Sequence, residues 1–261
     1  MTELQHRDVL DHGYIKLLRI DGDDNFIAET ARTSTDTSST VQKNMSLVNR
    51  LVRDRHTSPV EFVGVVVQIQ MPIFVARQWM RHRTGPFNEF SLRYSEAVDC
   101  FYVPETERCQ VQSTFNKQGS AEAVDPELAK WMRQEITDTS VDCFRSYTAL
   151  RDKGLTRELA RMVLPTNYYT KVRWKIDLHN LMHFMMLRED SHAQWEIQQY
   201  AKVMHEYAKL AFPKAVESFE NNIQNRQVIS KQLATLLAQA VDGISFPAEV
   251  QSELNEFLRR N

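Results

Sequence analysis

The sequence is poor in cysteine and glycine and has almost no net charge. It has only three cysteines in 261 residues, Cys100, Cys109 and Cys143, too few and too irregularly spaced for a disulfide framework or a zinc ribbon. The formal net charge of −2 argues against a general nucleic-acid or membrane-surface protein, because such proteins usually have a broad basic excess. We therefore expect the protein to reside in a reducing compartment. We also expect its basic residues to be concentrated in particular places rather than spread over the whole surface.

Long apolar runs are also missing. No run approaches the roughly 18 residues that a membrane span needs, and the first residues include Glu3, Arg7 and Asp8, unlike a secretory signal. We expect a cytoplasmic protein with no membrane partner. The hydrophobic content of 42% is enough for one compact domain with a sizeable core. No Gly-x-Gly-x-x-Gly motif is present, so a dinucleotide would have to be held without a Rossmann loop.

The most informative stretch runs from Gln78 to Tyr94. Pro72 can begin a helix, whose spacing would put Gln78 and Arg81 on one side. Gly85 and Pro86 would end that helix. Beyond them, three polar side chains are two residues apart, so an extended chain would direct all of them to the same face. These are Glu89, Ser91 and Arg93.

The residue types in this stretch suit a nucleotide. An arginine offers a planar fork that matches phosphate oxygens, a serine adds a further donor, and a glutamate accepts from ribose hydroxyl or ring N–H groups. The stretch therefore predicts a phosphate- and nucleoside-binding site.

Periodicity predicts a mixture of strands and helices around this stretch. Strands are expected over residues 13–20 and 62–71, and helices over 26–33, from 41, over 126–153, from 177 and from 191. The helix at 126–153 should bury a stripe of Leu128, Met132, Ile136, Cys143, Tyr147 and Leu150. We expect an extended segment at 94–103, a variable loop at 105–125, no regular element at 171–175, and two amphipathic helices at 228–240 and 248–260.

Two readings from other classes remain open. A basic-motif RNA-binding module would use the arginines from Arg81 to Arg93 on phosphates, and its binding would depend steeply on salt. A zinc hydrolase would use His179 and His183, which lie four residues apart. No glutamate follows His179 as in the zinc-protease helix motif, and no third ligand is evident, so we expect no metal.

Two blocks resemble the flavin-dependent thymidylate synthases. The first is Arg81-His82-Arg83, followed after seven residues by Ser91 and continued by Leu92-Arg93-Tyr94-Ser95. The second comprises the Glu-Leu-Ala-Arg-Met-Val-Leu-Pro segment from Glu158 and residues 187–197. The similarity extends from about Gly13 to about Phe219.

The resemblance implies an α+β fold, with mixed helices and an antiparallel sheet in one compact domain that assembles as a homotetramer. It implies conversion of dUMP to dTMP, with 5,10-methylenetetrahydrofolate as carbon donor and NADPH as hydride source through FAD. No covalent enzyme nucleophile and no nucleic-acid partner are expected. Residues 1–225 would form the catalytic domain and 226–261 a helical extension.

The resemblance also assigns site residues. FAD contacts are implied for Ser58, Arg81, His82, Arg83, Glu89, Asp177, Leu178, His179 and His183. Contacts with dUMP are implied for Gln78, Trp79, Met80, Arg81, Glu89, Phe90, Ser91, Leu92, Arg93, Arg161 and Arg188. Many members have asparagine in place of Asp177 and His183, and serine in place of Pro86.

Arg188 is the residue we expect to activate the substrate. Without a covalent nucleophile, the uracil ring must accept a hydride directly, and negative charge then develops along one edge of the ring. A guanidinium held there stabilises the transition state more than the ground state. Arg188 follows an apolar helix face and precedes two carboxylates, so it could lie at the rim of a dry pocket.

Overall fold

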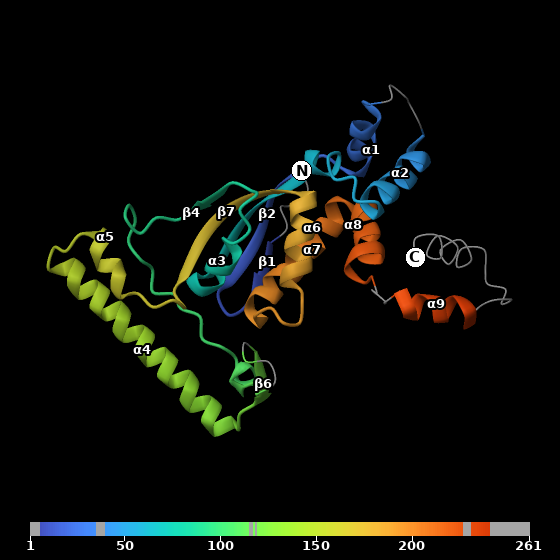
Figure 1. Ribbon diagram of the computed structural model, residues 1–261. Helices are drawn as coiled ribbons and strands as arrows, with labels where there is room; N and C mark the ends of the chain where they lie inside the picture. Colours follow the sequence, from blue (N-terminus) through green and yellow to red (C-terminus); the bar gives the residue numbers. More distant parts are fainter. Residues whose placement is uncertain (1–5, 35–39, 115–116, 118, 227–230, 241–261) are drawn as a thin grey trace. The chain divides into compact units, whose positions relative to one another are not determined.

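The computed structural model describes residues 6–34, 40–114, 117, 119–226 and 231–240. The chain divides into two compact units, residues 1–220 and 221–261. The first unit contains a five-stranded sheet in the order β1-β2-β3-β7-β4, in which every neighbouring pair is antiparallel. Its strands are β1 His6–Val9, β2 Gly13–Asp21, β3 Gly64–Pro72, β7 Tyr169–Asp177 and β4 Phe87–Glu89 (Figure 1). The α+β class with an antiparallel sheet is therefore confirmed.

Strand β3 lies at the centre of this sheet. Its alternating pattern predicts a strand with one buried face, and Val65, Val67, Ile69 and Met71 are indeed fully buried. The predicted start is corrected, because residues 60–62 form a short 3-10 helix, η1 Val60–Phe62, and Phe62 is 65% exposed. The chain must turn there before it can enter the sheet.

The neighbouring strand β7 was missed by the sequence analysis, which expected no regular element at 171–175. The alternation is present in the sequence: Val172, Trp174 and Ile176 are buried, whereas the cations between them are exposed. Three charged residues lower the strand propensity of the segment. Pairing along the whole of β3 overrides that local preference.

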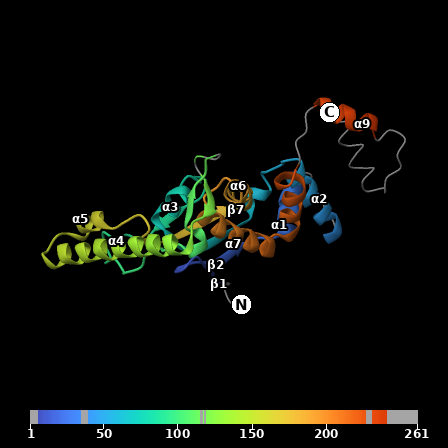
Figure 2. The same ribbon diagram turned by 90° about the horizontal axis from the view of Figure 1, so that it is seen from below.

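Three helices pack on the buried face of the sheet: α3 Ile73–Trp79, α6 Leu178–Arg188 and α7 Trp195–Ala211. Figure 2 shows α6 and α7 beside one another along the sheet. An aromatic cluster fills the space between these helices and β7, with the ring centroid of Trp79 at 4.5 Å from Phe184 and 5.2 Å from Trp174. These contacts fix the end of α3 and the middle of α6 relative to the sheet.

A smaller helical group lies beside η1, the short helix that precedes β3. It contains α1 Asp24–Arg32, α2 Val41–Arg53 and α8 Pro213–Phe219. Gly22 provides the turn from β2 to α1 with a φ of +80°, a conformation that favours glycine. The predicted strand at 13–20 and the helices at 26–33 and from 41 are confirmed. The helix predicted from 191 begins four residues later, at Trp195.

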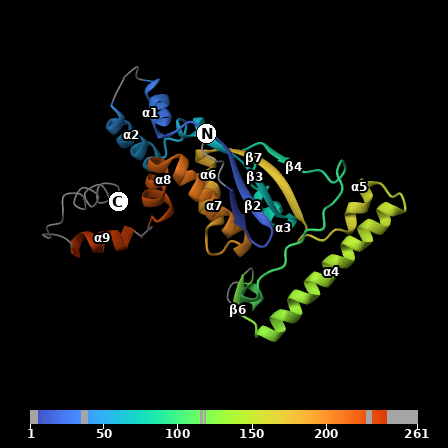
Figure 3. The same ribbon diagram turned by 180° about the vertical axis from the view of Figure 1, so that it is seen from behind.

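The long helix α4 Pro126–Asp152 is confirmed, and so is most of its predicted stripe, because Tyr147 is buried and Met132, Ile136, Cys143 and Leu150 are half-buried. Only Ala129, Ser140 and Tyr147 are buried, whereas Leu128 is 39% and Trp131 60% exposed. The main contacts of α4 are with α5 Arg157–Ala160 and the 3-10 helices η2 Thr106–Arg108 and η3 Arg161–Val163 (Figure 3). These short elements cannot cover a helix of this length.

The segment predicted as a variable loop contains regular structure. After η2, the strands β5 Gln110–Gln112 and β6 Ser120–Ala123 pair as an antiparallel ribbon. The preceding segment at 94–103 forms no strand and contributes one isolated bridge, from Phe101 to Tyr168. Short polar strands of this kind lack the apolar alternation that sequence patterns detect.

The second unit contains α9 Lys231–Ala240, which confirms most of the helix predicted at 228–240. The helix predicted at 248–260 lies outside the described residues. Within the described ranges, no helix is both long and apolar enough to cross a membrane.

Candidate active site

The cationic motif forms a loop directly after α3. The helix ends at Trp79, and His82 N–H then donates to the carbonyl of Trp79 at 3.0 Å. We expected the helix to continue to Gly85, so this boundary is a correction. Trp79, the last residue of α3, is fully buried against aromatic side chains. The residues that follow it are exposed or half-buried, so they have no apolar face that would continue the helix against the core. The side chains of Arg81, His82 and Arg83 therefore follow the helix on irregular backbone.

Gly85 allows this loop to pass close to β7. A Cβ atom at Gly85 would lie only 2.2 Å from the carbonyl oxygen of Lys175, so a larger residue would move the loop. The next residue is also held there, because Lys175 N–H donates to the carbonyl of Pro86 at 3.1 Å. The loop therefore returns to the sheet at β4.

Arg188 reaches this loop from the end of α6. Its Nε–H donates to His82 Nε2 at 2.9 Å, and Nη2 donates to the carbonyl of Gln78 at 3.2 Å. His82 accepts through Nε2, so a neutral ring has its hydrogen on Nδ1. Burial, followed by the positive charge of Arg188 and by His183, lowers the pKa of His82 to about 4. His82 is therefore a neutral donor near neutral pH.

Positive charge accumulates around this neutral ring. Arg81 and Arg83 are exposed, and the side chain of neither forms a hydrogen bond or ion pair with another described residue. Burial and the nearby charge of Arg81 lower the pKa of Arg188. Like charges gathered without a carboxylate repel one another. Binding of an anion would remove that repulsion.

Glu89 and the residues after it depart from the expected geometry. Glu89 is the last residue of β4, and its Oε1 accepts a hydrogen bond from Thr170 Oγ1 at 2.8 Å. The backbone then turns, with Tyr94 N–H donating to the carbonyl of Ser91 at 3.1 Å. Our prediction that Glu89, Ser91 and Arg93 share one strand face is therefore wrong. Next to Glu89, Phe90 N–H still donates to the carbonyl of Lys171 in β7, at 2.7 Å. Directly beyond it, the chain has no partner strand among the described residues and does not remain extended.

A second polar group lies at α5 and η3. Arg93 Nη2 is 3.4 Å from Glu158 Oε2, and Arg161 Nε donates to the carbonyl of Glu158 at 3.3 Å. Arg157 is instead bound to Glu96, at 3.3 Å. No hydrogen bond or ion pair among the described residues joins this group to the loop of Arg81. The structure thus places the predicted substrate arginines in two separate groups within one chain.

The remaining predicted residues lie on several elements. Ser58 is exposed in the turn before η1 and lines a cavity of about 740 Å³. Asp177 caps α6, accepting from Asn180 N–H at 2.9 Å and Asn180 Nδ2 at 2.8 Å. His179 and Leu92 are half-buried, and Met80, Phe90 and His183 are exposed. Trp79 and Leu178 are fully buried, so only their backbone could meet a ligand.

Sequence patterns missed two residues that hold this site. Gln194 accepts a hydrogen bond from Gln78 Nε2, and Thr170 donates to Glu89. In each of these two pairs, the donor and the acceptor residue are more than 80 positions apart in the chain. A sequence spacing gives no signal for such contacts. Only the strand pairing of β7 with β4, had it been predicted, would have pointed to Thr170.

The cysteines lie away from this chemistry. Cys109 is buried, with its Sγ 3.9 Å from the carbonyl of Ala129. Burial and nearby carboxylates raise the pKa of the Cys100 thiol. A raised pKa disfavours the thiolate that nucleophilic attack needs.

Comparison with known proteins gives a consistent assignment. Residues 16–214 match the family described as thymidylate synthase complementing protein. A flavin-dependent thymidylate synthase from Wolbachia pipientis wMel is 40% identical over 240 residues, covering 92% of this chain and 84% of the relative. One from Thermus thermophilus is 43% identical over 224 residues, covering 85% and 81% respectively.

The fold agrees with a solved structure. A UMP/dUMP methylase from Streptomyces cacaoi, bound with 5-Br dUMP, superposes with a TM-score of 0.73 at 28% identity. The superposition covers 82% of this chain and 97% of the methylase. The family match spans both the sheet and the helices that hold the cationic loop. The chain belongs to the flavin-dependent thymidylate synthase family.

Proposed function

We propose that this chain converts dUMP to dTMP, taking the carbon from 5,10-methylenetetrahydrofolate and the hydride from NADPH through FAD. The observation that supports this most directly is the cationic group of Arg81, Arg83 and Arg188 around the neutral His82. No carboxylate among the described residues pairs with these arginines. Such a group suits ligands that bring their own negative charge, as a flavin dinucleotide and a nucleotide both do.

The donor set around the loop fits FAD. Arg81 and Arg83 would hold the pyrophosphate, which needs cations when no glycine loop is present. His82 Nδ1–H, the Ser58 hydroxyl, His179 and His183 add hydrogen-bond donors. The Asp177 carboxylate already accepts two hydrogen bonds from Asn180, so we assign it to capping α6, with backbone of Leu178 nearer the ligand. FAD, when bound, relays hydride from NADPH to the pyrimidine.

The substrate would lie between the two polar groups. Gln78 and Glu89 offer an amide and a carboxylate for the sugar or the ring, and Ser91, Arg93 and Arg161 offer donors for the phosphate. Backbone of Trp79 and side chains of Met80, Phe90 and Leu92 would shape the pocket. The Streptomyces methylase was solved with a dUMP analogue bound, which supports a nucleotide ligand in this fold.

Arg188 is suited to activate the ring. His82 and the carbonyl of Gln78 occupy two of its N–H groups and fix the plane of the guanidinium. Its remaining N–H groups can face a carbonyl and a ring nitrogen together, as a fork can and an ammonium cannot. This arrangement would stabilise developing negative charge without a covalent enzyme nucleophile.

We further propose that residues 1–225 form the catalytic domain of a homotetramer whose sites are shared between subunits. Large apolar side chains are exposed along α4, η3 and the turn after β4, including Trp131 at 60%, Met162 at 72% and Tyr94 at 79%. Exposed patches of this kind mark contact surfaces. A second subunit would also explain why the arginines fall into two groups within one chain.

Subunit mixing tests the shared site. Inactive Arg93→Ala and inactive Arg188→Ala chains, unfolded together and reassembled, should regain part of the wild-type activity. Light scattering should report a tetramer for both variants. If verified mixed tetramers show no activity, each site is built within one chain.

The reaction itself is tested by colour and product. Purified protein should be yellow, NADPH should bleach its flavin absorbance, and dUMP with methylenetetrahydrofolate should restore the colour while dTMP forms. A colourless protein that binds RNA with a steep salt dependence would instead support the RNA-binding alternative.

A further inference from the structure

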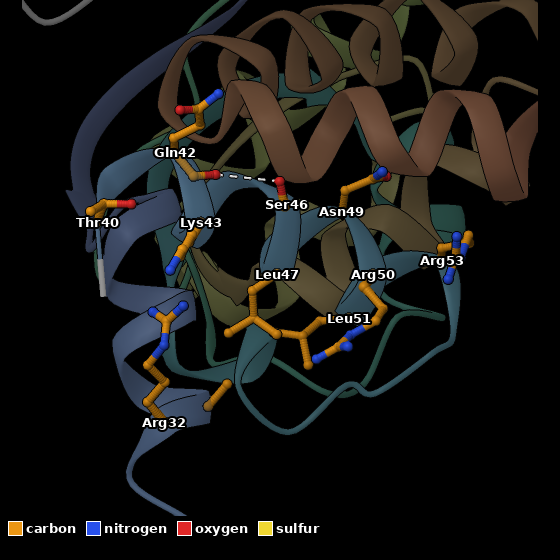
Figure 4. A pocket seen from close by; sticks show the side chains of 11 residues that line it. Arg32, Thr40, Gln42, Lys43, Ser46, Leu47, Asn49, Arg50, Leu51 and Arg53 are labelled. Carbon is orange, nitrogen blue, oxygen red and sulfur yellow. Dashed lines mark hydrogen bonds between the residues drawn. The ribbon is translucent and has the colours of Figure 1, made fainter. Parts of the chain in front are cut away.

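A second cationic pocket lies between α1 and α2, outside the site described above. It has a volume of about 960 Å³ and is shown in Figure 4. Four cations line it: Arg32, Lys43, Arg50 and Arg53. No acidic side chain among the described residues is part of its lining. This composition is unusual in a chain whose formal net charge is −2.

The cations of this pocket differ in their partners. Arg53 pairs with Asp54 at 3.0 Å, at one end of the pocket. Arg32 donates to the neutral amide oxygen of Asn44. The side chains of Lys43 and Arg50 form no hydrogen bond or ion pair with any described residue. Two positive charges on one side of α2 are thus available to a ligand.

The charged ends also converge. Figure 4 shows Arg32 of α1 and Lys43 of α2 pointing toward one another across the pocket. An anionic group of the size of a phosphate can pair with the Lys43 ammonium on this side of α2. Arg50 lies about two turns further along the same face of the helix, within reach of the same ligand.

Between the cations the pocket is apolar. Leu47 and Leu51 lie four residues apart on α2, and Ala31 of α1 also lines the pocket. Lys43, Leu47 and Arg50 are spaced so that they fall on the same side of the helix. Apolar side chains with cations at their edges suit a purine ring that has phosphate on its ribose.

The pocket adjoins the cavity at the turn that contains Ser58. That cavity, of about 740 Å³, contains Ser58 and shares Ala31 and Leu51 with the cationic pocket. A dinucleotide could therefore place a reactive ring near Ser58 and its other nucleotide over α2. The two cavities meet at the boundary between α1 and α2.

We infer that the α1–α2 pocket binds the phosphorylated adenosine arm of the nicotinamide co-substrate, with Lys43 and Arg50 on its 2′-phosphate. This inference rests on the proposed function, because it assumes that a reduced nicotinamide dinucleotide supplies the hydride. NADPH and NADH differ only in the 2′-phosphate. The pocket therefore gives the enzyme its preference for NADPH.

The test measures flavin reduction by each dinucleotide in the flavin-loaded enzyme. In the Lys43→Ala/Arg50→Ala variant, the concentration of NADPH that gives half-maximal reduction should rise about tenfold or more, since each lost charge-assisted contact weakens binding by about that factor. The value for NADH should not change. Adenosine 2′,5′-bisphosphate should inhibit wild type and lose its effect in the variant, whereas adenosine 5′-phosphate should inhibit both weakly and equally. Lys153→Ala/Lys202→Ala removes two exposed lysines elsewhere and serves as the control.

Three results would overturn the inference while leaving the reaction intact. The first is a wild-type enzyme that uses NADH as well as NADPH. The second is an equal loss for both dinucleotides in the variant. The third is a change confined to methylenetetrahydrofolate with a long glutamate tail, which would assign the cations to the carboxylates of the folate. If no flavin binds and no dTMP forms in wild type, the proposed function itself fails.

Discussion

Two arginine groups in this chain have opposite surroundings. Arg108 Nε lies 2.8 Å from the Glu196 carboxylate, and the two side chains are only 17% and 4% exposed. The Tyr102 hydroxyl donates to the same carboxylate at 3.2 Å. Arg188, by contrast, donates to a neutral imidazole and a carbonyl, with Arg81 nearby as a second cation.

The difference separates stability from function. A buried arginine with a carboxylate partner holds two elements together, and breaking the pair leaves a charge that water cannot solvate. Cations that gather without a carboxylate destabilise the free protein and are stabilised by an anionic ligand. We therefore expect substitutions at Arg108 and Glu196 to affect unfolding, and substitutions around Arg188 to affect ligands and turnover.

The largest effect should come from Glu196→Ala. It leaves Arg108 buried without its partner, and such a change costs about 3–5 kcal/mol of the free energy of unfolding. Denaturant unfolding at fixed protein concentration measures this loss. Glu61→Ala, at an exposed position, should change stability by less than about 0.5 kcal/mol. Equal midpoints for the two variants would contradict a structural role for the pair.

The next largest effect should come from Arg188→Lys, and it should appear in turnover. A lysine keeps the charge but loses the fork. Flavin binding and flavin reduction by NADPH should remain near wild type. Oxidation of the reduced flavin by dUMP and methylenetetrahydrofolate should slow by about 100-fold, the usual scale for one electrostatic donor. A wild-type rate for this half-reaction would assign the activating role to another residue.

A smaller effect is expected for Arg81→Ala and Arg83→Ala. Each removes one charge-assisted contact to phosphate, which should weaken flavin retention by about ten- to a hundredfold. Flavin occupancy after dialysis measures it. Because neither arginine pairs with a described residue, the free energy of unfolding without flavin should hold or rise slightly. Full occupancy in both variants would remove the cationic loop from the flavin site.

The contrast also explains what the sequence could and could not predict. Local patterns predict the strand around Val65 and the helix around Tyr147 because each depends on neighbours in the chain. The cationic motif predicts the nucleotide site from residue types alone. The pair of Arg188 with His82 joins residues 106 positions apart, and no spacing rule reports it. Likewise, β7 is recognised only once its pairing with β3 is known.

Exposure is the second property that a single-chain pattern misjudges. Leu128 fits an apolar stripe on α4 and yet is 39% exposed, because periodicity identifies an apolar face but not whether anything covers it. Trp79 is the opposite case: it lies inside the nucleotide motif, but its side chain belongs to the aromatic core. Both errors arise from packing between distant elements.

The smallest effect involves His205, a cation whose pairing depends on pH. Its Nδ1 lies 2.8 Å from Glu189 and its Nε2 lies 3.1 Å from Glu220, which also binds Lys209 at 2.9 Å. The hydrogen bond with Glu189 raises the pKa of His205; the charges of Glu189 and Glu220 act in the same direction, whereas burial and Lys209 oppose it. His205 thus resembles Arg108 when protonated and becomes a neutral, weakly bound ring when it is not.

A raised pKa fixes the direction of the pH dependence. The folded protein holds the proton more tightly than the unfolded chain, so the contribution is complete below the unfolded pKa of about 6.5 and is lost as pH rises through the folded value. Wild type should therefore exceed His205→Gln in stability by about 1 kcal/mol at low pH, with the gap closing at higher pH. His6→Gln, which removes an exposed pair with Asp8, should show little gap at any pH. Glu189 directly follows Arg188, so loss of the proton from His205 should also loosen the end of α6 and lower turnover. A gap that is constant with pH would show that His205 contributes packing rather than charge.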